Sequence, residues 1–416
     1  MAQFSFIGFD PRLTIQIKNG KALTHNEKTG EETREAVADP LAVIKRAVSG
    51  RATANKDFRF AGGAVGYISY DSVRYVEKLP TNARDTLGFP DLEMGVFDDG
   101  VVFDHKQKRA YYYYYGENRL SEIEELLKKT TDAETATFSQ PKVNTTKEAY
   151  EQAVEKAKQY ITQGDIFQVV LSKRFGFRFK GELTEFYGSL RDINPSPYMY
   201  FYKAGNRQIV GSSPEMLARV ENRTVETFPI AGTRPSAKSA VENRRLAREL
   251  LADPKERAEH VMLVDLARND VGKVAKFGSV RVPELMQVHR YSHVQHIVSR
   301  VVGDLKDGCD CFDALRAVFP AGTVSGAPKV RAMEIIEELE PTRRGPYAGA
   351  VGYFSYNGNS DFAITIRTLF AEKDRAYIQA GAGIVADSVP EREWSETEHK
   401  AGALMKALQT CRGETQ

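Results

Sequence analysis

The sequence predicts a mixed fold of helices and strands, either one large α/β or α+β unit or two ordinary domains. The first observation is its length of 416 residues. The second is a globular composition, with 42% hydrophobic and 27% charged residues. The third is the patterning, because glycine-bearing segments with β-branched and aromatic residues, typical of strands, alternate with charged segments of helical periodicity.

Residues 1–129 are expected to form an N-terminal α+β region. An alternating pattern over 4–17 predicts a strand, and so does the glycine-bearing run 61–71. Residues 101–115 predict a hairpin around a polar turn, and 120–129 predict a charged helix.

The stretch 130–146 is the clearest boundary in the chain. It is rich in threonine, with proline and serine and little apolar pattern, so we expect a linker there. An amphipathic helix is expected over 147–162, ended by Gly164, and residues 166–179 predict a long strand. Residues 147–416 then form a second region, which we expect to carry the chemistry of the chain.

One segment is nearly repeated. GAVGYISY at 63–70 recurs as GAVGYFSY at 349–356. Both are glycine-rich strands with aromatic residues, which indicates at most that the two halves of the chain contain similar sheet units.

Composition excludes several classes of protein. The net charge of +2 gives no electrostatic footprint for nucleic acid or a membrane surface. The chain has no apolar run of about 18 residues to span a membrane, and its N-terminus lacks the layout of a signal peptide. Three cysteines without a CxxC motif fit a reducing, cytoplasmic location.

Two acidic helix faces occur in the second half of the chain. Glu393, Glu396 and Lys400 recur at i, i+3 and i+7 after a glycine-rich turn, and Glu256 and Glu259 repeat the glutamate spacing. Carboxylates stacked in this way repel each other unless a cation lies between them or both point into water. Either pair alone is usually a solvated face, but together they indicate a hard divalent metal.

Glycine-rich loops interrupt the apolar runs of the second half, at 229–235, 319–329, 347–354 and 380–385. Their backbone amides can approach a ligand closely and bind an anion. None has the spacing of a P-loop or a dinucleotide fingerprint. Arg367, Lys329 and Lys400 are interleaved with the loops, and this combination suits a small substrate with more than one carboxylate.

Longer motifs carry a family resemblance. They are, in order, GSSPEML, PIAGTRP, ERAEHVMLVDLARND, YSHVQHIVS, FPAGTVSGAPK, GPYAGAVGYFS, AITIRT and GAGIVADSVPEREWSETEHK. With them the chain resembles the chorismate-utilising enzymes, and among these the large synthase subunits (component I) of anthranilate synthases. The resemblance covers residues 150–408 and continues more weakly over the first 130. It implies an α+β fold in which two large antiparallel sheets form a two-layer sandwich flanked by helices.

The resemblance implies Mg²⁺ as the cofactor. Glu259 and Glu396 would bind the metal directly, and Glu256 and Glu393 would bind it through water. The metal would hold the ring carboxylate of chorismate, which is chemically sensible because Mg²⁺ prefers carboxylates and retains water.

The resemblance also implies a binding pocket for chorismate. Arg367, Tyr347 and the amide of Gly383 would grip the enolpyruvyl carboxylate, Arg367 with a planar fork of donors. The other residues of this pocket would be Thr323, Ala231, Gly232, Thr233, Gly381 and Ala382.

Three residues would take part in the chemistry. Glu215 would act as general acid toward the 4-hydroxyl, which leaves poorly unless it is protonated. His296 would lie near that hydroxyl and assist the loss of pyruvate, and Lys400 would stabilise charge at the metal site. Structural roles are the alternatives: Glu215 capping a turn after Pro214, His296 as a hydrogen-bonded core residue, and Arg367 paired with a structural carboxylate. Within the matched motifs the functional interpretation is favoured.

Two positions indicate which reaction the chain catalyses. In relatives that add water to chorismate, a lysine acts as base at the position of Gln168. A neutral amide cannot take that role, whereas ammonia needs no base. In the para-aminobenzoate branch a lysine replaces Ala231 and attacks the ring as an amine. Gln168 and Ala231 therefore favour attack of ammonia at the 2-position, followed by elimination of pyruvate to give anthranilate.

The chain itself has no candidate for releasing ammonia from glutamine. A glutaminase of this kind needs a nucleophilic cysteine in a glycine-rich elbow, and Cys309, Cys311 and Cys411 lack that context. We therefore expect a separate glutamine amidotransferase subunit as partner, or the use of free ammonia in vitro.

Feedback inhibition by tryptophan is expected to be weakened or absent. Subunits of the resembled kind carry an N-terminal Leu-Leu-Glu-Ser motif that forms part of a tryptophan site, and this sequence contains no such motif. The other half of the expected site, residues 194–199, is present.

The sequence thus predicts Mg²⁺-dependent formation of anthranilate and pyruvate from chorismate and ammonia, the first step of tryptophan biosynthesis. Three alternatives stay open. They are an enzyme that stops at aminodeoxyisochorismate and retains the pyruvate, a synthase of the para-aminobenzoate branch, and a non-catalytic sensor of chorismate or another aromatic ligand. Pyruvate release separates the first, and a sensor would have no need of Glu215.

Overall fold

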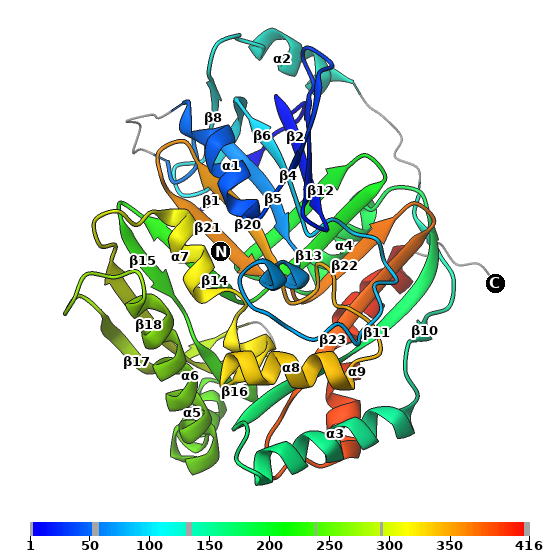
Figure 1. Cartoon of the computed structure of the whole chain (residues 1–416), viewed down its shortest axis with the longest axis vertical. Coiled ribbons are helices and arrows are strands. Elements are labelled where there is room, and N and C mark those ends of the chain that lie inside the picture. The colour runs from blue at the N-terminus through cyan, green and yellow to red at the C-terminus, as the bar shows by residue number, and fades with distance from the viewer. Residues whose placement is uncertain (1–2, 52–57, 130–134, 238, 292–293, 412–416) are drawn as a thin grey trace.

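The computed structural model describes residues 3–51, 58–129, 135–237, 239–291 and 294–411. Within them the chain forms three antiparallel sheets with helices around them (Figure 1). The main hydrophobic core mixes side chains of the two larger sheets, such as Ile15 and Leu217 from one and Ile209 and Phe370 from the other. The predicted α+β fold with two large facing sheets is confirmed.

The largest sheet has twelve strands in the described residues. Its order is β16 (Ile230–Pro235), β18 (Val294–Asp304), β15 (Thr224–Thr227), β14 (Met216–Glu221), β21 (Ser360–Ile364), β20 (Ala350–Ser355), β5 (Gly63–Ile68), β6 (Leu92–Phe97), β2 (Leu13–Lys18), β3 (Lys21–Asn26) and β4 (Glu32–Ala36), with β17 (Arg281–Arg290) also paired to β18.

The second sheet has eight strands in the described residues. Its order is β10 (Lys142–Val143), β11 (Gln168–Lys180), β23 (Arg375–Ile384), β22 (Thr368–Glu372), β13 (Arg207–Ser213) and β12 (Tyr198–Ala204), with β19 (Gly326–Ala327) and β9 (Thr137–Phe138) also paired to β11. A small third sheet is formed by β1 (Phe4–Ile7), β7 (Asp99–Asp104) and β8 (Arg109–Tyr114).

The helices lie outside the sheets (Figure 1). They are α1 (Pro40–Ser49), α2 (Leu120–Lys128), α3 (Lys147–Thr162), α4 (Thr184–Ile193), α5 (Ala240–Ala252), α6 (Pro254–Gly272), α7 (Cys311–Val318), α8 (Lys329–Leu339) and α9 (Pro390–Cys411), with short 3₁₀ turns η1 (Tyr70–Tyr75) and η2 (Gly322–Val324). Helices α3 and α9 pack on β11 and β23, whereas α5 and α6 pack on β16 and β18.

Most predicted elements occur at the expected positions. The strand within 61–71, the hairpin β7–β8 and the helix α3 agree with the sequence patterns. The structure differs in the predicted linker, where residues 135–146 contain β9 and β10 on β11. Residues 130–134 of that linker lie outside the described residues.

The single strand expected over 4–17 is wrong, because two strands in different sheets replace it. β1 pairs with β7, and β2 pairs with β3 and β6. The chain leaves the extended path at Asp10, whose φ is 51°, and Pro11 follows without an N–H to donate to a sheet. The alternation of apolar residues continues through this bend, so the pattern alone does not reveal it.

The two copies of the repeated segment are neighbouring strands. β5 and β20 are hydrogen-bonded side by side, with Gly66 opposite Gly352. A methyl group at Gly352 would lie 2.0 Å from the carbonyl oxygen of Asp361, and one at Gly66 would lie 2.1 Å from that of Glu93. The glycines therefore let adjacent strands approach, and the largest sheet is continuous between the N-terminal region and the second region.

The two faces of the β11–β23 strand pair have different surroundings, because one face packs against the core beneath α3. Directly opposed residues of antiparallel strands point to the same side, and successive pairs alternate. Leu171 and Ala382 are opposed and belong to the core beneath α3. Val170 and Gly383, the next pair, point the other way, as does Gln168 two residues earlier.

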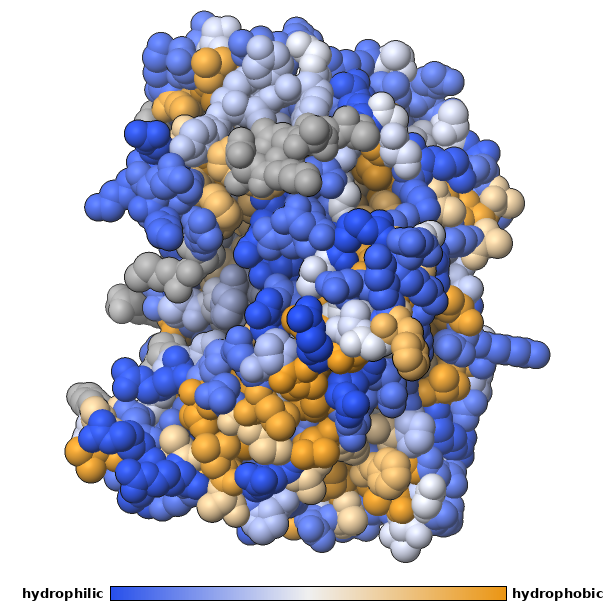
Figure 2. Space-filling view, turned by 90° about the vertical axis from the view of Figure 1, so that its left-hand side faces the viewer, coloured by the Kyte–Doolittle hydropathy of each residue, from blue (hydrophilic) through white to orange (hydrophobic). Residues whose placement is uncertain are grey.

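The surface is not uniform in polarity. On the face shown in Figure 2, hydrophobic side chains gather in the lower half, whereas the upper half is mainly hydrophilic. Exposed hydrophobic residues of the second region include Phe167, Val241, Phe277 and Leu285. None of the helices in the described ranges combines the length and the apolar character that crossing a membrane requires.

Candidate active site

The predicted site residues come from both large sheets and from two helices. Gln168 begins β11, Gly381, Ala382 and Gly383 lie in β23, Ala231, Gly232 and Thr233 lie in β16, His296 lies in β18, Glu256 and Glu259 lie on α6, and Glu393, Glu396 and Lys400 lie on α9. Four more lie in η2 or in segments outside the strands and helices: Glu215, Thr323, Tyr347 and Arg367.

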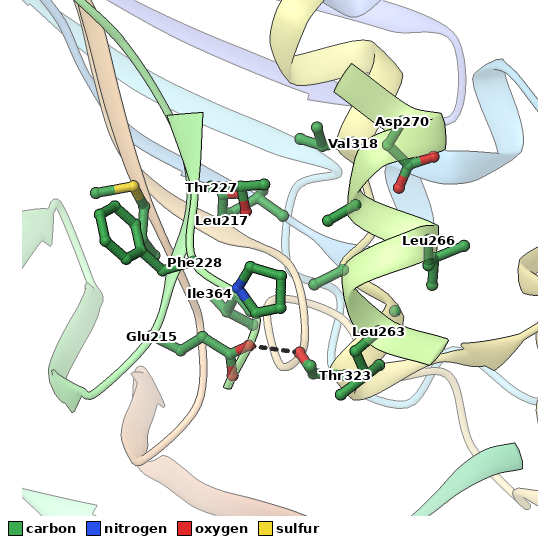
Figure 3. Close-up of a pocket in the computed structure, with 15 residues that line it drawn as sticks. Glu215, Leu217, Thr227, Phe228, Leu263, Leu266, Asp270, Val318, Thr323 and Ile364 are labelled. Atoms are coloured by element: carbon green, nitrogen blue, oxygen red, sulfur yellow. Dashed lines mark hydrogen bonds between the residues drawn. The ribbon is translucent and has the colours of Figure 1, made fainter. Parts of the chain in front are cut away.

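Glu215 precedes β14 and is buried, with 8% of its surface exposed. Its Oε1 accepts a hydrogen bond of 2.8 Å from the hydroxyl of Thr323, and the two side chains point toward each other (Figure 3). Burial raises the pKa of Glu215 to about 8, although Thr323 and the charge of Lys400 oppose the shift. Glu215 is therefore a protonated acid at neutral pH.

Glu215 borders a small cavity between β14 and α6 (Figure 3). The cavity has a volume of about 40 Å³ and its wall is mainly apolar, with Leu263 and Leu266 on the α6 side. This space accommodates water rather than a ring-containing substrate. Burial of the Glu215 carboxyl beside this mainly apolar wall is the physical cause of its raised pKa.

His296 is held by its Nδ1 atom. Nδ1 lies 2.8 Å from the carbonyl oxygen of Gly232 and 3.1 Å from the hydroxyl of Thr233. A carbonyl can only accept, so Nδ1 carries the proton and Nε2 of the neutral ring keeps its lone pair. Burial lowers the pKa of His296, and the positive charges of Arg367 and Lys400 lower it further. His296 is therefore a neutral imidazole with Nε2 available as a base.

Gln168 and Glu259 connect the sheet to α6. Nε2 of Gln168 donates a hydrogen bond of 3.0 Å to Oε1 of Glu259. Oε1 of Gln168 is buried and has no hydrogen-bond partner among the described residues. Burial raises the pKa of Glu259, and the negative charges of Glu256 and Glu396 raise it further.

Two of the other carboxylates of the acidic faces contact cations of the chain. Glu256 pairs with Arg234 at 3.0 Å, and Glu396 pairs with Lys400 at 2.7 Å. Burial and the charge of Glu396 raise the pKa of Glu393. As these side chains stand, no three acidic, histidine or cysteine side chains of the described ranges lie close enough to hold a metal ion together.

Arg367 offers a cation without a structural counter-ion. Among the residues that the structure describes, none forms a hydrogen bond or an ion pair with the guanidinium group of Arg367. Its backbone φ is 52°, a left-handed conformation that a non-glycine residue rarely adopts. Burial lowers the pKa of Arg367, while Tyr347 and Glu396 raise it, so both lie within electrostatic reach. The predicted structural alternative, pairing with a carboxylate, is thus not observed.

The glycines of β23 let side chains approach the strand. A methyl group at Gly383 would lie 2.6 Å from Nε2 of Gln168, and one at Gly381 would lie 2.9 Å from the hydroxyl oxygen of Tyr347. Nζ of Lys400 donates a hydrogen bond of 2.9 Å to the carbonyl of Gly381. A side chain at Gly381 or Gly383 would therefore displace these neighbours from their present positions.

Three residues near the site differ from the sequence analysis or were missed by it. Lys329, expected among the cations of the loops, instead binds Asp270 at 2.7 Å and so has a structural role. Arg234, the partner of Glu256, was not predicted, although it directly follows the PIAGT motif. Tyr291 was also missed. Its ring packs edge-on against His296 with ring centroids 5.6 Å apart. Burial raises the pKa of Tyr291, and the negative charge of Glu215 raises it further.

The arrangement combines an acid, a base and a free cation. Glu215 can protonate a leaving oxygen, and Nε2 of His296 can accept a proton. Arg367 can bind a carboxylate through two parallel hydrogen bonds. Such a site suits a small anionic substrate that loses a hydroxyl or ether oxygen.

Comparison with known proteins points to one family. Residues 2–406 match the chorismate binding enzymes. The chain is 49% identical over 409 residues to anthranilate synthase component 1 of Methanothermobacter thermautotrophicus, covering 98% of this chain and 86% of the relative. It is 44% identical over 429 residues to aminodeoxychorismate synthase component 1 of Bacillus subtilis, covering 99% of this chain and 91% of the relative.

The fold has a counterpart among solved structures. The crystal structure of anthranilate synthase component I from Streptococcus pneumoniae superposes with a TM-score of 0.87 at 38% sequence identity. The match covers 97% of this chain and 92% of the other.

Proposed function

The chain belongs to the chorismate-binding enzyme family, and from this premise we propose that it is the synthase component of an anthranilate synthase. It converts chorismate and ammonia to anthranilate and pyruvate, in tryptophan biosynthesis. The observation that carries the proposal is the buried, protonated carboxyl of Glu215, because loss of the 4-hydroxyl of chorismate needs an acid at neutral pH.

The remaining side chains act on different parts of the substrate. Arg367, with the hydroxyl of Tyr347 beside Gly381, receives the enolpyruvyl carboxylate. His296 keeps Nε2 free to accept a proton when pyruvate is eliminated. Thr323 orients the Glu215 carboxyl toward the leaving hydroxyl.

The donor set fits Mg²⁺. Glu259 carries a raised pKa partly because Glu256 and Glu396 repel its charge, and a divalent cation would relieve that repulsion. Glu259 and Glu396 would bind the metal, with Glu256 and Glu393 holding its water, and Arg234 and Lys400 would then release the carboxylates they contact now. When bound, the metal supplies positive charge for the ring carboxylate of chorismate.

Gln168 and Ala231 select ammonia as the nucleophile. The Gln168 amide donates to Glu259 and has no basic group with which to deprotonate water. The methyl group of Ala231 cannot attack the ring as an amine would. Free ammonia is already nucleophilic and needs neither function.

The ammonia comes from outside this chain. Burial raises the pKa of Cys311 to about 12 and also raises that of Cys411, so neither provides a thiolate for glutamine hydrolysis. The curated relatives are named component 1. We infer a glutamine amidotransferase subunit as partner, with free ammonia as its substitute in vitro.

A second candidate function follows from the relative in Bacillus subtilis, whose name is aminodeoxychorismate synthase component 1. An enzyme of that kind would attach nitrogen at the 4-position and leave pyruvate attached. Ala231 argues against the lysine-dependent version of this route. The product decides between the two functions.

The test is a paired assay on the purified chain. Chorismate, Mg²⁺ and ammonium salt are mixed, and anthranilate fluorescence and pyruvate are followed together. Both should rise at equal rates and stop with EDTA. E259Q and E396Q should lose activity that higher Mg²⁺ partly restores. Consumption of chorismate without release of pyruvate would contradict the proposal and favour an aminodeoxy product. If chorismate is not consumed even when the partner subunit is present, the result would contradict the proposal and favour a sensor.

A further inference from the structure

Lys173 is a buried cation that the proposed reaction does not use. It lies in β11, with 0% of its surface exposed. Its Nζ is 2.9 Å from the centroid of the Trp394 ring, and the rings of Phe175 and Tyr150 lie at 5.5 and 5.9 Å. An ammonium group surrounded by ring faces is stabilised by their quadrupoles, most strongly by that of tryptophan.

Further contacts of Lys173 also reach α9. Nζ lies 3.4 Å from the carbonyl oxygen of Trp394 and 3.4 Å from Oε1 of Glu398. Tyr150 of α3 packs edge-on against Trp394 with ring centroids 5.6 Å apart. Lys173 therefore joins β11 to the first turns of α9, and α3 closes the cluster from the other side. Burial lowers the pKa of Lys173 to about 8, so the group is charged at neutral pH.

The position of these contacts on α9 gives them a consequence for the site. At 100° per residue, Trp394 and Glu398 share one face of the helix, and Glu393, Glu396 and Lys400 share another. A contact that fixes the first face fixes the rotation of the helix about its axis. That rotation decides where the carboxylates of Glu393 and Glu396 point.

We propose that Lys173 is a positioning residue for the metal-binding face of α9, acting through Trp394. The aromatic cluster holds α9 in the rotation that presents Glu396 and Glu393 toward Glu259 on α6. This inference rests on the proposed function for the metal, but the cluster itself is observed independently of it.

The chain offers a direct spectroscopic probe, because Trp394 is its only tryptophan. In the metal-free chain, K173M removes the ammonium group and retains an unbranched apolar side chain that suits an aromatic site. In K173M, the quenching of Trp394 fluorescence by acrylamide should increase at least about twofold relative to wild type, because the Trp394 ring loses its contact with the ammonium group. K173R, which keeps a cation over the ring, should restore the wild-type quenching.

Metal affinity is the second measurement. Mg²⁺ is titrated calorimetrically into the full chain with chorismate present and ammonium absent, so that no turnover occurs. K173M should weaken the Mg²⁺ affinity about tenfold and raise the Mg²⁺ concentration for half-maximal activity equally, with a smaller effect on kcat. W394L should weaken the Mg²⁺ affinity similarly. The effects of K173M and W394L on this affinity should not add in the double variant. K156M is the matched control, because Lys156 lies over the Tyr160 ring at 5.2 Å on α3.

The outcomes separate this inference from the proposed function. Wild-type Mg²⁺ affinity in K173M, or unchanged acrylamide quenching, overturns the positioning role. If wild type binds no Mg²⁺, the metal assignment fails, and the quenching comparison alone decides whether Lys173 holds α9. If K173M does not fold, the Mg²⁺ affinity of W394L, compared with that of wild type and K173R, decides the positioning role, and a wild-type affinity in W394L overturns it.

Discussion

The hydroxyl of Thr323 donates a 2.8 Å hydrogen bond to Oε1 of Glu215, a residue 108 positions earlier in the chain. The bond stabilises the carboxylate form, whereas burial stabilises the protonated form more strongly, and the pKa of Glu215 rises to about 8. Acid strength at this position is thus the balance of two opposing local effects, and each can be changed separately.

Removing the hydrogen bond should shift the activity profile to higher pH. In T323V the carboxylate loses a donor, so the pKa of Glu215 rises and the acid survives to higher pH. The alkaline decline of kcat, expected near pH 8 in wild type, should move up by about one pH unit. The profile must be measured at constant free ammonia, because ammonium also deprotonates in this range. A shift to lower pH would contradict the assignment of Glu215 as the acid.

The raised pKa of Glu215 also makes stability depend on pH. Between about pH 4.5 and 8 the folded chain keeps a proton that the unfolded chain releases, so the free energy of unfolding falls as pH rises. E215Q cannot release this proton. The free energy of unfolding of E215Q, relative to that of wild type, should therefore be about 2 to 4 kcal/mol higher at pH 8 than at pH 5. This range follows from about 1.4 kcal/mol per pKa unit.

Urea unfolding at the two pH values measures this difference. E124Q is the matched control, since Glu124 lies exposed on α2, and its profile should follow that of wild type. A stability difference between E215Q and wild type that does not change with pH would show that Glu215 ionises normally. E215Q should also lose kcat by about 10²- to 10⁴-fold.

Adding one methyl group to β23 should damage the site without unfolding the chain. In G383A the new carbon would lie 2.6 Å from Nε2 of Gln168 and would displace that amide from Glu259. We expect the KM for chorismate to rise about tenfold. G402A is the control, because nothing lies within 4 Å of the added carbon on α9. It should keep full activity and gain about 0.5 to 1 kcal/mol of stability, as glycine is unfavourable inside a helix.

Substitution of Arg367 should weaken substrate binding. R367M removes the cation offered to the enolpyruvyl carboxylate, and the KM for chorismate should rise about 100-fold. R367K keeps the charge but loses the planar fork, so its KM should rise about tenfold. R223K is the matched control, because Arg223 also has a positive φ, of 65°, and its side chain is exposed. Equal effects of R367K and R223K on the KM would contradict a specific role of Arg367 in recognising the carboxylate.

The sequence allowed much of the fold and site to be predicted, for identifiable reasons. α3 has an unbroken helical pattern and a Thr146 cap, so its bounds follow from local chemistry. Glu256 with Glu259, and Glu393 with Glu396, stand out because helix spacing alone places each pair on one face. The family motifs then brought Glu215, His296 and Arg367 into one hypothesis.

Other features depend on tertiary packing and could not be predicted in this way. The pairing of Arg234 with Glu256 requires β16 and α6 to pack together, and Lys329 reaches Asp270 only because α8 lies near the end of α6. The cage around Lys173 draws its rings from β11, α3 and α9. The bend at Asp10 interrupts a strand without interrupting its apolar alternation.

The pairing of β5 with β20 has a consequence for how the chain reaches its native state. These strands are separated by more than half of the sequence, so the centre of the largest sheet closes only after nearly the whole chain is available. A chain divided ahead of α3 would leave an unpaired strand edge on each fragment, β5 on one and β20 on the other. The two fragments carry complementary edges, and mixing them offers a route to reassembly of the enzyme from separately made halves.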